Sequence, residues 1–352
     1  MEIGPPAGGL EIENFMPITF WSSLKKPIFA LAPMHDVTDT AFRQLVAEIA
    51  KPDVLFTEFV AVDGLVHAQS QEKMVKHYLQ FAEIERPIVA QIWGNNPDHF
   101  YKSAQLIEKL GFDGIDINMG CPDKQIVKLG GGAALIQDAP RAVEIIQATQ
   151  EATRLPVSVK TRLGFNSIDL SFIQKIAVTK PVAITIHART KRELSLVPAH
   201  WEVLTHIAPE LQKEGIIVLG NGDIKTHQEA LQRIQETNVD GVMIGRGVFG
   251  NPWIFSPLEN VLPQARLQSY KDDFSLTGLI PPLAKHLKAL LRHTELFEEA
   301  FGKTKNFSVI KKHVHGHVHG FAGAKEMRNK IMEAKTIGEM KNAIKDIMLI
   351  YK

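Results

Sequence analysis

Eight short apolar segments, each followed by a longer stretch of mixed polarity, recur along most of this chain. They span residues 28–32, 54–58, 88–92, 114–118, 157–161, 183–187, 216–220 and 241–245. Several are apolar at nearly every position, which is typical of parallel strands covered on both faces. The stretches between them, such as 40–50, 97–110, 139–153, 167–178 and 226–237, have the periodicity of amphipathic helices. Repeated strand-then-helix units over about 230 residues favour a (β/α)8 TIM barrel over a doubly wound sheet.

The residues after Trp253 follow a different pattern. Helical periodicity continues through 276–299, 304–319, 324–333 and 337–350, while 258–273 lacks the β-branched runs of a strand and is interpreted as a linker. We therefore predict three parts: a flexible N-terminal tail at 1–18, a barrel at 19–257, and a linker with a small helical bundle at 258–352.

The composition argues against several classes of protein. The formal net charge is +1 at pH 7, so the chain is not basic throughout, although charge can be concentrated in one region. No segment approaches the roughly 20 apolar residues of a membrane helix. The first residues lack the basic start and apolar core of a signal peptide. We expect a cytoplasmic monomer without a membrane partner.

Polar side chains gather where the predicted strands end, and in this fold that end of the barrel carries the active site. Lys160 lies within an apolar strand, where an unpaired ammonium would be costly. Gln91, Arg162 and His187 belong to the ends of neighbouring strands. A shared anionic ligand explains this group better than four separate structural roles.

Glycine-containing turns follow the seventh and eighth strands, at Asn221-Gly222-Asp223 and Gly245-Arg246-Gly247. Many barrels of this fold bind phosphate at this pair of turns, on backbone N–H groups. Arg246 can add a charge-assisted contact. Because tight turns between strand and helix need glycine in any case, each turn alone is only a weak indication of a phosphate site.

The only cysteine, Cys121, follows the fourth strand in the turn Asn118-Met119-Gly120-Cys121-Pro122. It cannot form an internal disulfide, and no metal-ligand spacing surrounds it. A lone cysteine is more often a buried spectator than a catalytic group. Its place at the predicted barrel mouth favours the catalytic alternative.

Taken in order, these motifs resemble those of one family, the tRNA-dihydrouridine synthases, flavin enzymes that reduce uridine in tRNA. The resemblance covers residues 27–255 and continues more weakly into the tail. Its motifs lie at 32–39, 57–60, 91–94, 116–122, 130–135, 157–162, 187–190, 220–224 and 244–247, with weaker matches at 311–313 and 320–328. Two features depart from the family pattern: Ala188 replaces a usual glycine, and 194–199 lacks the usual tyrosine and glycine.

The resemblance implies that the barrel binds FMN and that NADPH or NADH is the reductant. The phosphate would lie at the turns 221–223 and 245–246, and the ring would lie across the barrel mouth with Lys160 near its pyrimidine end. The implied cofactor-binding residues are Pro33, Met34, His35, Gln91, Lys160, His187, Asn221, Gly222, Asp223, Gly245 and Arg246.

The resemblance also implies a tRNA uridine as substrate, turned out of its loop into the barrel mouth. Asn118, Lys160 and Arg162 would hold the uracil edge, while Cys121 would donate a proton to C5 after a hydride reaches C6. A thiol with an ordinary pKa near 8.5 is protonated at pH 7. The carbon formed at C5 is far more basic than a thiolate, so this proton transfer runs downhill.

Basic residues of the predicted helical tail form a candidate surface for tRNA phosphates. They are Lys303, Lys305, Lys311, Lys312, Lys325, Arg328 and Lys330. A solvated helix face is the alternative interpretation. His313, His315, His317 and His319 also alternate here, but neighbours at this spacing point to different faces of a helix, so we predict no metal site.

Two other functions remain open at this point. A flavin barrel oxidoreductase could act on a free pyrimidine-like small molecule, which would leave the basic tail without a role. Alternatively, the chain could be a non-catalytic RNA-binding flavoprotein, in which case Cys121 would have no catalytic role. No motif specifies which uridine of tRNA is reduced, or whether NADPH or NADH is preferred.

Overall fold

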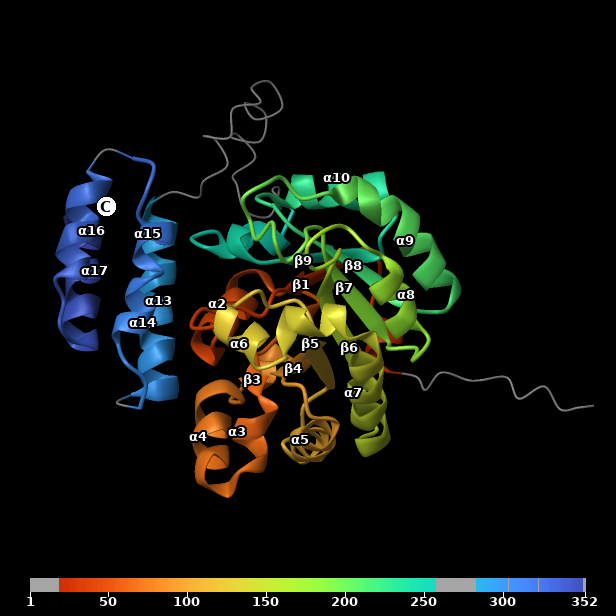
Figure 1. Ribbon diagram of the computed structural model, residues 1–352. Helices are drawn as coiled ribbons and strands as arrows, with labels where there is room; N and C mark the ends of the chain where they lie inside the picture. Colours follow the sequence, from red (N-terminus) through yellow and green to blue (C-terminus); the bar gives the residue numbers. More distant parts are fainter. Residues whose placement is uncertain (1–18, 258–282, 303, 322, 351–352) are drawn as a thin grey trace, which may run out of the picture.

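The computed structural model describes residues 19–257, 283–302, 304–321 and 323–350 (Figure 1). The predicted N-terminal tail at 1–18, the linker at 258–273 and the first residues of the predicted helix at 276–299 lie outside these ranges. Within them, no helix combines the length and the apolar character that crossing a bilayer requires.

Eight parallel strands close into a barrel, as predicted. They are β1 (Ile28–Leu31), β2 (Val54–Phe56), β4 (Ile88–Trp93), β5 (Gly114–Asn118), β6 (Val157–Arg162), β7 (Ala183–His187), β8 (Ile217–Asn221) and β9 (Gly241–Ile244). β1 pairs with both β2 and β9, which closes the ring. A further two-residue strand, β3 (Val60–Ala61), pairs with the end of β4 and was not predicted.

Helices surround this barrel (Figure 1). Those that follow strands are α2 (Thr40–Ala50), α5 (Pro97–Lys109), α7 (Ala139–Ala152), α8 (Ser171–Ala177), α9 (Trp201–Lys213) and α10 (His227–Thr237), with α3 (Val62–Val66), α4 (Ala68–Tyr78) and α6 (Lys124–Lys128) in longer connections. Side-chain caps define several starts: Asp39 accepts from the Phe42 amide, Asp138 from Arg141, and Thr226 from Glu229.

The barrel interior changes from apolar to polar along its axis. Its first layers are apolar, and α1 (Phe20–Ser23) places Trp21 among them. The residues of this inner cluster are Trp21, Ile28, Ala30, Ala32, Val54, Phe56, Val89, Ala183, Leu219 and Met243. Because side chains alternate along a strand, the next inward positions, such as Lys160 after Ser158, bring polar groups to the carboxyl ends.

The C-terminal helices pack beside the barrel against α2 (Figure 1). They are α13 (Leu283–Phe301), α14 (Ser308–Lys311), α15 (Val314–His317), α16 (Ala324–Met332) and α17 (Ile337–Ile350). The single helix predicted at 304–319 is wrong, because this segment forms two short helices. Gly316 lies against the backbone of Gly250, and His313 packs against the rings of Phe42 and Phe249, so contacts with the barrel shape this segment.

Candidate active site

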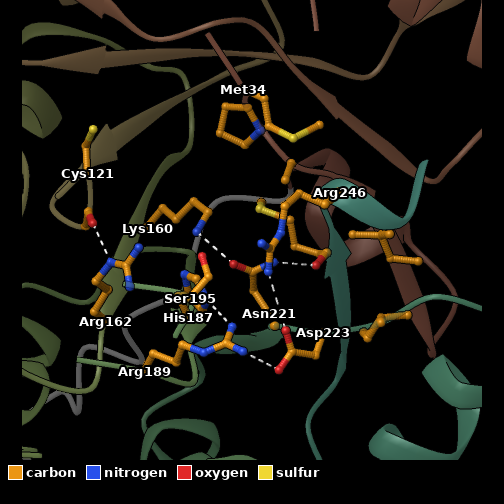
Figure 2. A pocket seen from close by; sticks show the side chains of 18 of the residues that line it. Met34, Cys121, Lys160, Arg162, His187, Arg189, Ser195, Asn221, Asp223 and Arg246 are labelled. Carbon is orange, nitrogen blue, oxygen red and sulfur yellow. Dashed lines mark hydrogen bonds and ion pairs between the residues drawn. The ribbon is translucent and has the colours of Figure 1, made fainter. Parts of the chain in front are cut away.

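A cavity of about 650 Å³ opens at the carboxyl ends of the barrel strands. It contains every cofactor-binding residue predicted from the sequence except His35, together with Cys121, Asn118 and Arg162. Figure 2 shows their arrangement, with Cys121 at one side of the cavity, Met34 at another, and Lys160 between Cys121 and Asn221. Residues that are far apart in the sequence therefore line one cavity, because they lie at the carboxyl ends of the barrel strands.

Strand register places these polar side chains at similar heights in the barrel. Asn118 pairs with Lys160 across β5 and β6. Arg162 pairs with His187 across β6 and β7, and His187 pairs in turn with Asn221 across β7 and β8. Because the strands are parallel and adjacent, residues separated by about 100 positions in the sequence line one cavity wall.

The loop that carries Cys121 is fixed by backbone contacts on both sides. Asn118 Oδ1 accepts hydrogen bonds from the amides of Gly120 at 3.1 Å and Cys121 at 2.9 Å. The Cys121 carbonyl accepts from the Ala133 amide at 3.0 Å. Gly132, at φ 56°, lies so close that a Cβ there would be 2.8 Å from the Cys121 carbonyl oxygen. Asn118 therefore orients the thiol loop.

The Cys121 side chain is partly buried and lines the cavity. Burial raises the pKa of its thiol above the ordinary value, and the negative charge of Asp123 adds to this rise. A hydrogen bond from the Asp123 backbone and the charges of Arg162 and Lys160 oppose it. The thiol is therefore protonated at neutral pH. This is the form that can donate a proton, rather than the thiolate that a nucleophile requires.

Lys160 extends into the cavity and donates to Asn221 Oδ1 at 3.1 Å (Figure 2). Asn221 is itself held by a hydrogen bond from its Nδ2 to the Met243 carbonyl at 2.8 Å. Burial lowers the pKa of Lys160 to about 8, and repulsion from Arg162 acts in the same direction. The ammonium has one neutral partner here, so it is well placed to receive an anion.

A buried polar network lies beneath the cavity. Asp116 accepts from Gln91 Nε2 at 2.7 Å and from Ser158 Oγ at 2.6 Å. Asn118 Nδ2 donates to Gln91 Oε1 at 3.0 Å. Burial raises the pKa of Asp116 to about 6, while the two hydrogen bonds lower it. The network fixes the amide of Gln91, with its oxygen toward Asn118.

Arg162 joins two loops to β6. Its Nε donates to the Gly120 carbonyl at 2.7 Å, and its Nη1 donates to the carbonyls of Thr190 at 3.1 Å and Leu194 at 3.3 Å. These contacts connect the loops after β5 and β7 to β6. The sequence predicted that the Arg162 guanidinium binds substrate. The structure places Arg162 on the cavity wall, but its Nε and Nη1 already donate to carbonyls of the protein.

A cluster of charged side chains, centred on Asp223, lies at the turns after β8 and β9. Asp223 accepts from Arg189 Nη2 and lies 3.5 Å from Arg246 Nη2 (Figure 2). Arg189 Nη1 also contacts His187 Nε2 at 3.2 Å. Since a guanidinium only donates, Nε2 accepts and the ring proton lies on Nδ1. Burial and four nearby cations hold the pKa of His187 far below its ordinary value, so the ring is neutral.

The family model described as dihydrouridine synthase (Dus) matches residues 30–350. The chain belongs to the dihydrouridine synthase family. The assignment made from the motifs is therefore confirmed. Membership makes the chain a flavin-dependent oxidoreductase that forms dihydrouridine.

Two curated relatives illustrate the match. A probable tRNA-dihydrouridine synthase of Staphylococcus aureus (strain COL) is 38% identical over 329 residues, covering 91% of this chain and 93% of that protein. A probable tRNA-dihydrouridine synthase 2 of Bacillus subtilis (strain 168) is 37% identical over 332 residues, covering 93% and 96%. The solved structure of morphinone reductase in complex with tetrahydroNAD is similar at a TM-score of 0.46 and 12% identity over 66% of this chain and 86% of that chain.

His35 lies outside the cavity of this family member. Its ring stacks on Tyr78 with centroids 5.8 Å apart and lies 5.6 Å from the ring of Phe59. Its Nδ1 is 3.8 Å from Glu58. The adjacent Pro33 and Met34 do line the cavity, so the loop turns away from the site within one residue.

Some residues of the motifs were given no role. Arg189 forms an ion pair with Asp223, Asp116 holds the polar network beneath the cavity, and Phe59 lines the cavity wall. Ser195, which lies outside the motifs, lines the wall as well. Arg189 lies two residues after His187, close enough to the strand end to be predicted. Ser195 lies deep in a loop, and no local pattern indicates that such a loop folds back over the cavity.

The predicted basic surface of the tail is partly wrong. Lys305 is buried and pairs with Asp39 at 3.0 Å and Glu58 at 3.3 Å. His313 and His317 are buried as well. Lys312 remains half exposed beside Asp36, at 3.1 Å. Lys305 and Lys312 bind barrel carboxylates and so hold the C-terminal helices against the barrel. The spacing of lysines in the sequence does not indicate such contacts.

Two further tail residues predicted to bind tRNA also contact the protein itself. Lys311 donates to the Met332 carbonyl at 2.8 Å, and Arg328 donates to the Val318 carbonyl at 2.7 Å. Lys325 is exposed, and Lys330 lies 3.4 Å from Asp346. Lys303 lies outside the described residues.

Proposed function

We propose that this chain is a tRNA-dihydrouridine synthase that uses FMN and is reduced by NADPH or NADH. The reaction saturates the C5–C6 bond of a uridine in tRNA. The observation that supports it most directly is one cavity in which a protonated thiol, Cys121, faces the same space as a partly buried ammonium, Lys160, and an arginine-bearing glycine turn.

The residues of the cavity suit a flavin mononucleotide. At about 650 Å³ the cavity has the size of cofactor sites. The amides of Asp223 and Ile224 donate to no other residue that the structure describes, and the Arg246 guanidinium is 65% exposed beside them. Open amides and a guanidinium at the turns after the last two strands are suited to a phosphate.

A flavin held by these residues would, once reduced, supply the hydride for C6 of the uracil. Lys160, beside Asn221 in the cavity wall, would stabilise negative charge on the reduced ring because its ammonium is fixed by a hydrogen bond. Gln91, held by Asp116, would present an oriented amide to the cofactor. Neutral His187 carries its ring proton on Nδ1 and could donate it to the same group.

Cys121 donates the proton that C5 needs. Its raised pKa keeps the thiol protonated, and the transfer runs toward a much stronger base. Arg162 and Asn118 position the loop that carries this thiol, through the Gly120 carbonyl and the amides of Gly120 and Cys121. The tail supplies surface lysines, such as Lys325, for phosphates of the tRNA.

Lys160→Met tests the electrostatic role of this ammonium. We expect the midpoint potential of the bound flavin to fall in the variant at pH 7, because the reduced, anionic ring loses its cation. The pKa of Lys160 is about 8, so the ammonium is charged below that pH and neutral above it. The difference in potential between wild type and variant should therefore narrow above pH 8. A potentiometric titration from pH 6.5 to 9.5 measures this, and a constant difference over that range would contradict it.

The function itself is tested by mapping dihydrouridine in tRNA by mass spectrometry, from cells with and without this gene. We expect loss of dihydrouridine at defined positions in the deletion strain and its restoration by the purified protein with FMN and NADPH. Unchanged maps would overturn the proposal. Equal turnover of free uridine and tRNA would favour the small-molecule alternative.

A further inference from the structure

The loop after β7, residues 188–200, carries exposed leucines at the edge of the cavity. Ser195 lines the cavity wall, and its two neighbours point elsewhere: Leu194 is 42% exposed and Leu196 is 83% exposed. Of the large apolar side chains that the structure describes, Leu196 is the most exposed. Single exposed leucines are common on protein surfaces; what distinguishes Leu196 is its place one residue from Ser195, which lines the cavity.

This loop is held in a defined shape. Arg189 Nε donates to the Val197 carbonyl at 2.7 Å, and Arg162 Nη1 donates to the Leu194 carbonyl at 3.3 Å. The amide of Leu196 donates to the Glu193 carbonyl at 2.9 Å. Leu194 has φ 53°, a conformation that is unfavourable for a branched residue. Two buried guanidiniums thus hold a strained turn with Leu196 outermost.

Basic and aromatic groups flank the leucines. The loop after β6 is joined to this one by hydrogen bonds from the Lys191 amide to Gly164 and from the Arg192 amide to Phe165, both at 2.9 Å. Lys191 Nζ lies 4.7 Å from the centre of the Phe165 ring, and the side chain of Arg192 is exposed. The surface therefore combines apolar tips with cations, which matches unpaired bases and their phosphates.

We propose that Leu196 is an apolar wedge that contacts the bases flanking the target uridine and fills the space left when that uridine turns into the cavity. This inference rests on the proposed function, because it assumes a tRNA substrate. A base cannot leave its stack without exposing its neighbours. Leucine is among the apolar side chains that proteins insert between base steps, and Leu196 lies one residue from Ser195 on the cavity wall.

The test compares Leu196→Ser with Leu196→Met and with Val178→Ser. Val178 is 73% exposed but follows α8, at the opposite end of the barrel, and so serves as the matched control. For Leu196→Ser we expect kcat/KM on a tRNA transcript to fall about tenfold, because the apolar contact that offsets unstacking of the flanking bases is lost. The Leu196→Met and Val178→Ser variants should keep the wild-type value. Reduction of the bound flavin by NADPH without RNA should be equal in all four proteins.

A second readout follows the RNA. A tRNA transcript with 2-aminopurine beside the target uridine should brighten on binding wild type and much less on binding Leu196→Ser. Equal kcat/KM in wild type and Leu196→Ser, or equal losses in both serine variants, would overturn the wedge. The wedge would also be overturned if sedimentation showed wild type to be a dimer and Leu196→Ser to be a monomer, because the leucine would then contact a second copy of the chain. If wild type forms dihydrouridine in tRNA but shows no 2-aminopurine difference from Leu196→Ser, the proposed function stands and the wedge fails; if wild type forms no dihydrouridine, both fail.

Discussion

Cys121→Ala should lower the rate of dihydrouridine formation by about 10²–10⁴, the usual contribution of a positioned general acid. The thiol lines the same cavity as Lys160 (Figure 2). Its removal leaves the loop in place, because that loop is held by the amides and carbonyls of Gly120 and Cys121 and not by the side chain. A single-turnover assay with reduced flavin and tRNA isolates this step.

Two controls separate acid catalysis from structure. Flavin content, flavin reduction by NADPH and tRNA affinity should be unchanged in Cys121→Ala. Cys121→Ser has a similar size but a far weaker acid, so it should also be slow. Since burial raises the pKa of the thiol, the wild-type rate should show no loss between pH 6 and roughly 8.5. A wild-type rate in Cys121→Ala would show that another group donates the proton.

Lys305→Met should destabilise the protein by about 3–5 kcal/mol, the typical cost of leaving a buried charge without its partner. The ammonium lies between Asp39, at 3.0 Å, and Glu58, at 3.3 Å, and all three side chains are buried. Asp39 also caps α2 and Glu58 accepts from the Asp36 amide. The variant therefore weakens the contact between the C-terminal helices and the barrel. Urea unfolding at pH 8 measures the loss.

Lys312→Met is the matched control. This lysine joins the same two parts of the protein through Asp36 at 3.1 Å, but both side chains are substantially exposed, so its loss should cost less than about 1 kcal/mol. If both variants lost the same free energy of unfolding, burial of the Lys305 ion pair would not account for its effect.

The destabilisation by Lys305→Met should be smaller at acid pH. Burial raises the pKa of Glu58 to about 7, and Lys305 opposes this rise. Without Lys305 the folded-state pKa is higher still, whereas the unfolded value stays near 4.3. A carboxyl with a raised pKa is tolerated while protonated and lowers stability as pH rises through its folded-state pKa. The variant should therefore lose less stability at pH 5.5 than at pH 8, relative to wild type.

Local sequence patterns predicted the barrel because each strand and helix has its own periodicity. All eight barrel strands begin within one residue of the predicted positions. The two-residue strand β3 and the broken helix at 304–319 were missed. Both depend on packing: β3 exists through its pairing with β4, and the segment containing Gly316 follows the barrel surface.

The sequence alone determined that Cys121, Lys160 and Asn221 share one cavity, because parallel strands bring their carboxyl ends together whatever the sequence distance between them. Only the tertiary structure decided which charged groups are available there. Arg162 is engaged by three loop carbonyls, and Lys305 pairs with Asp39, 266 positions away. Whether a cation faces solvent, a ligand or a buried partner depends on which distant surfaces pack against it, and neither local propensity nor spacing contains that information.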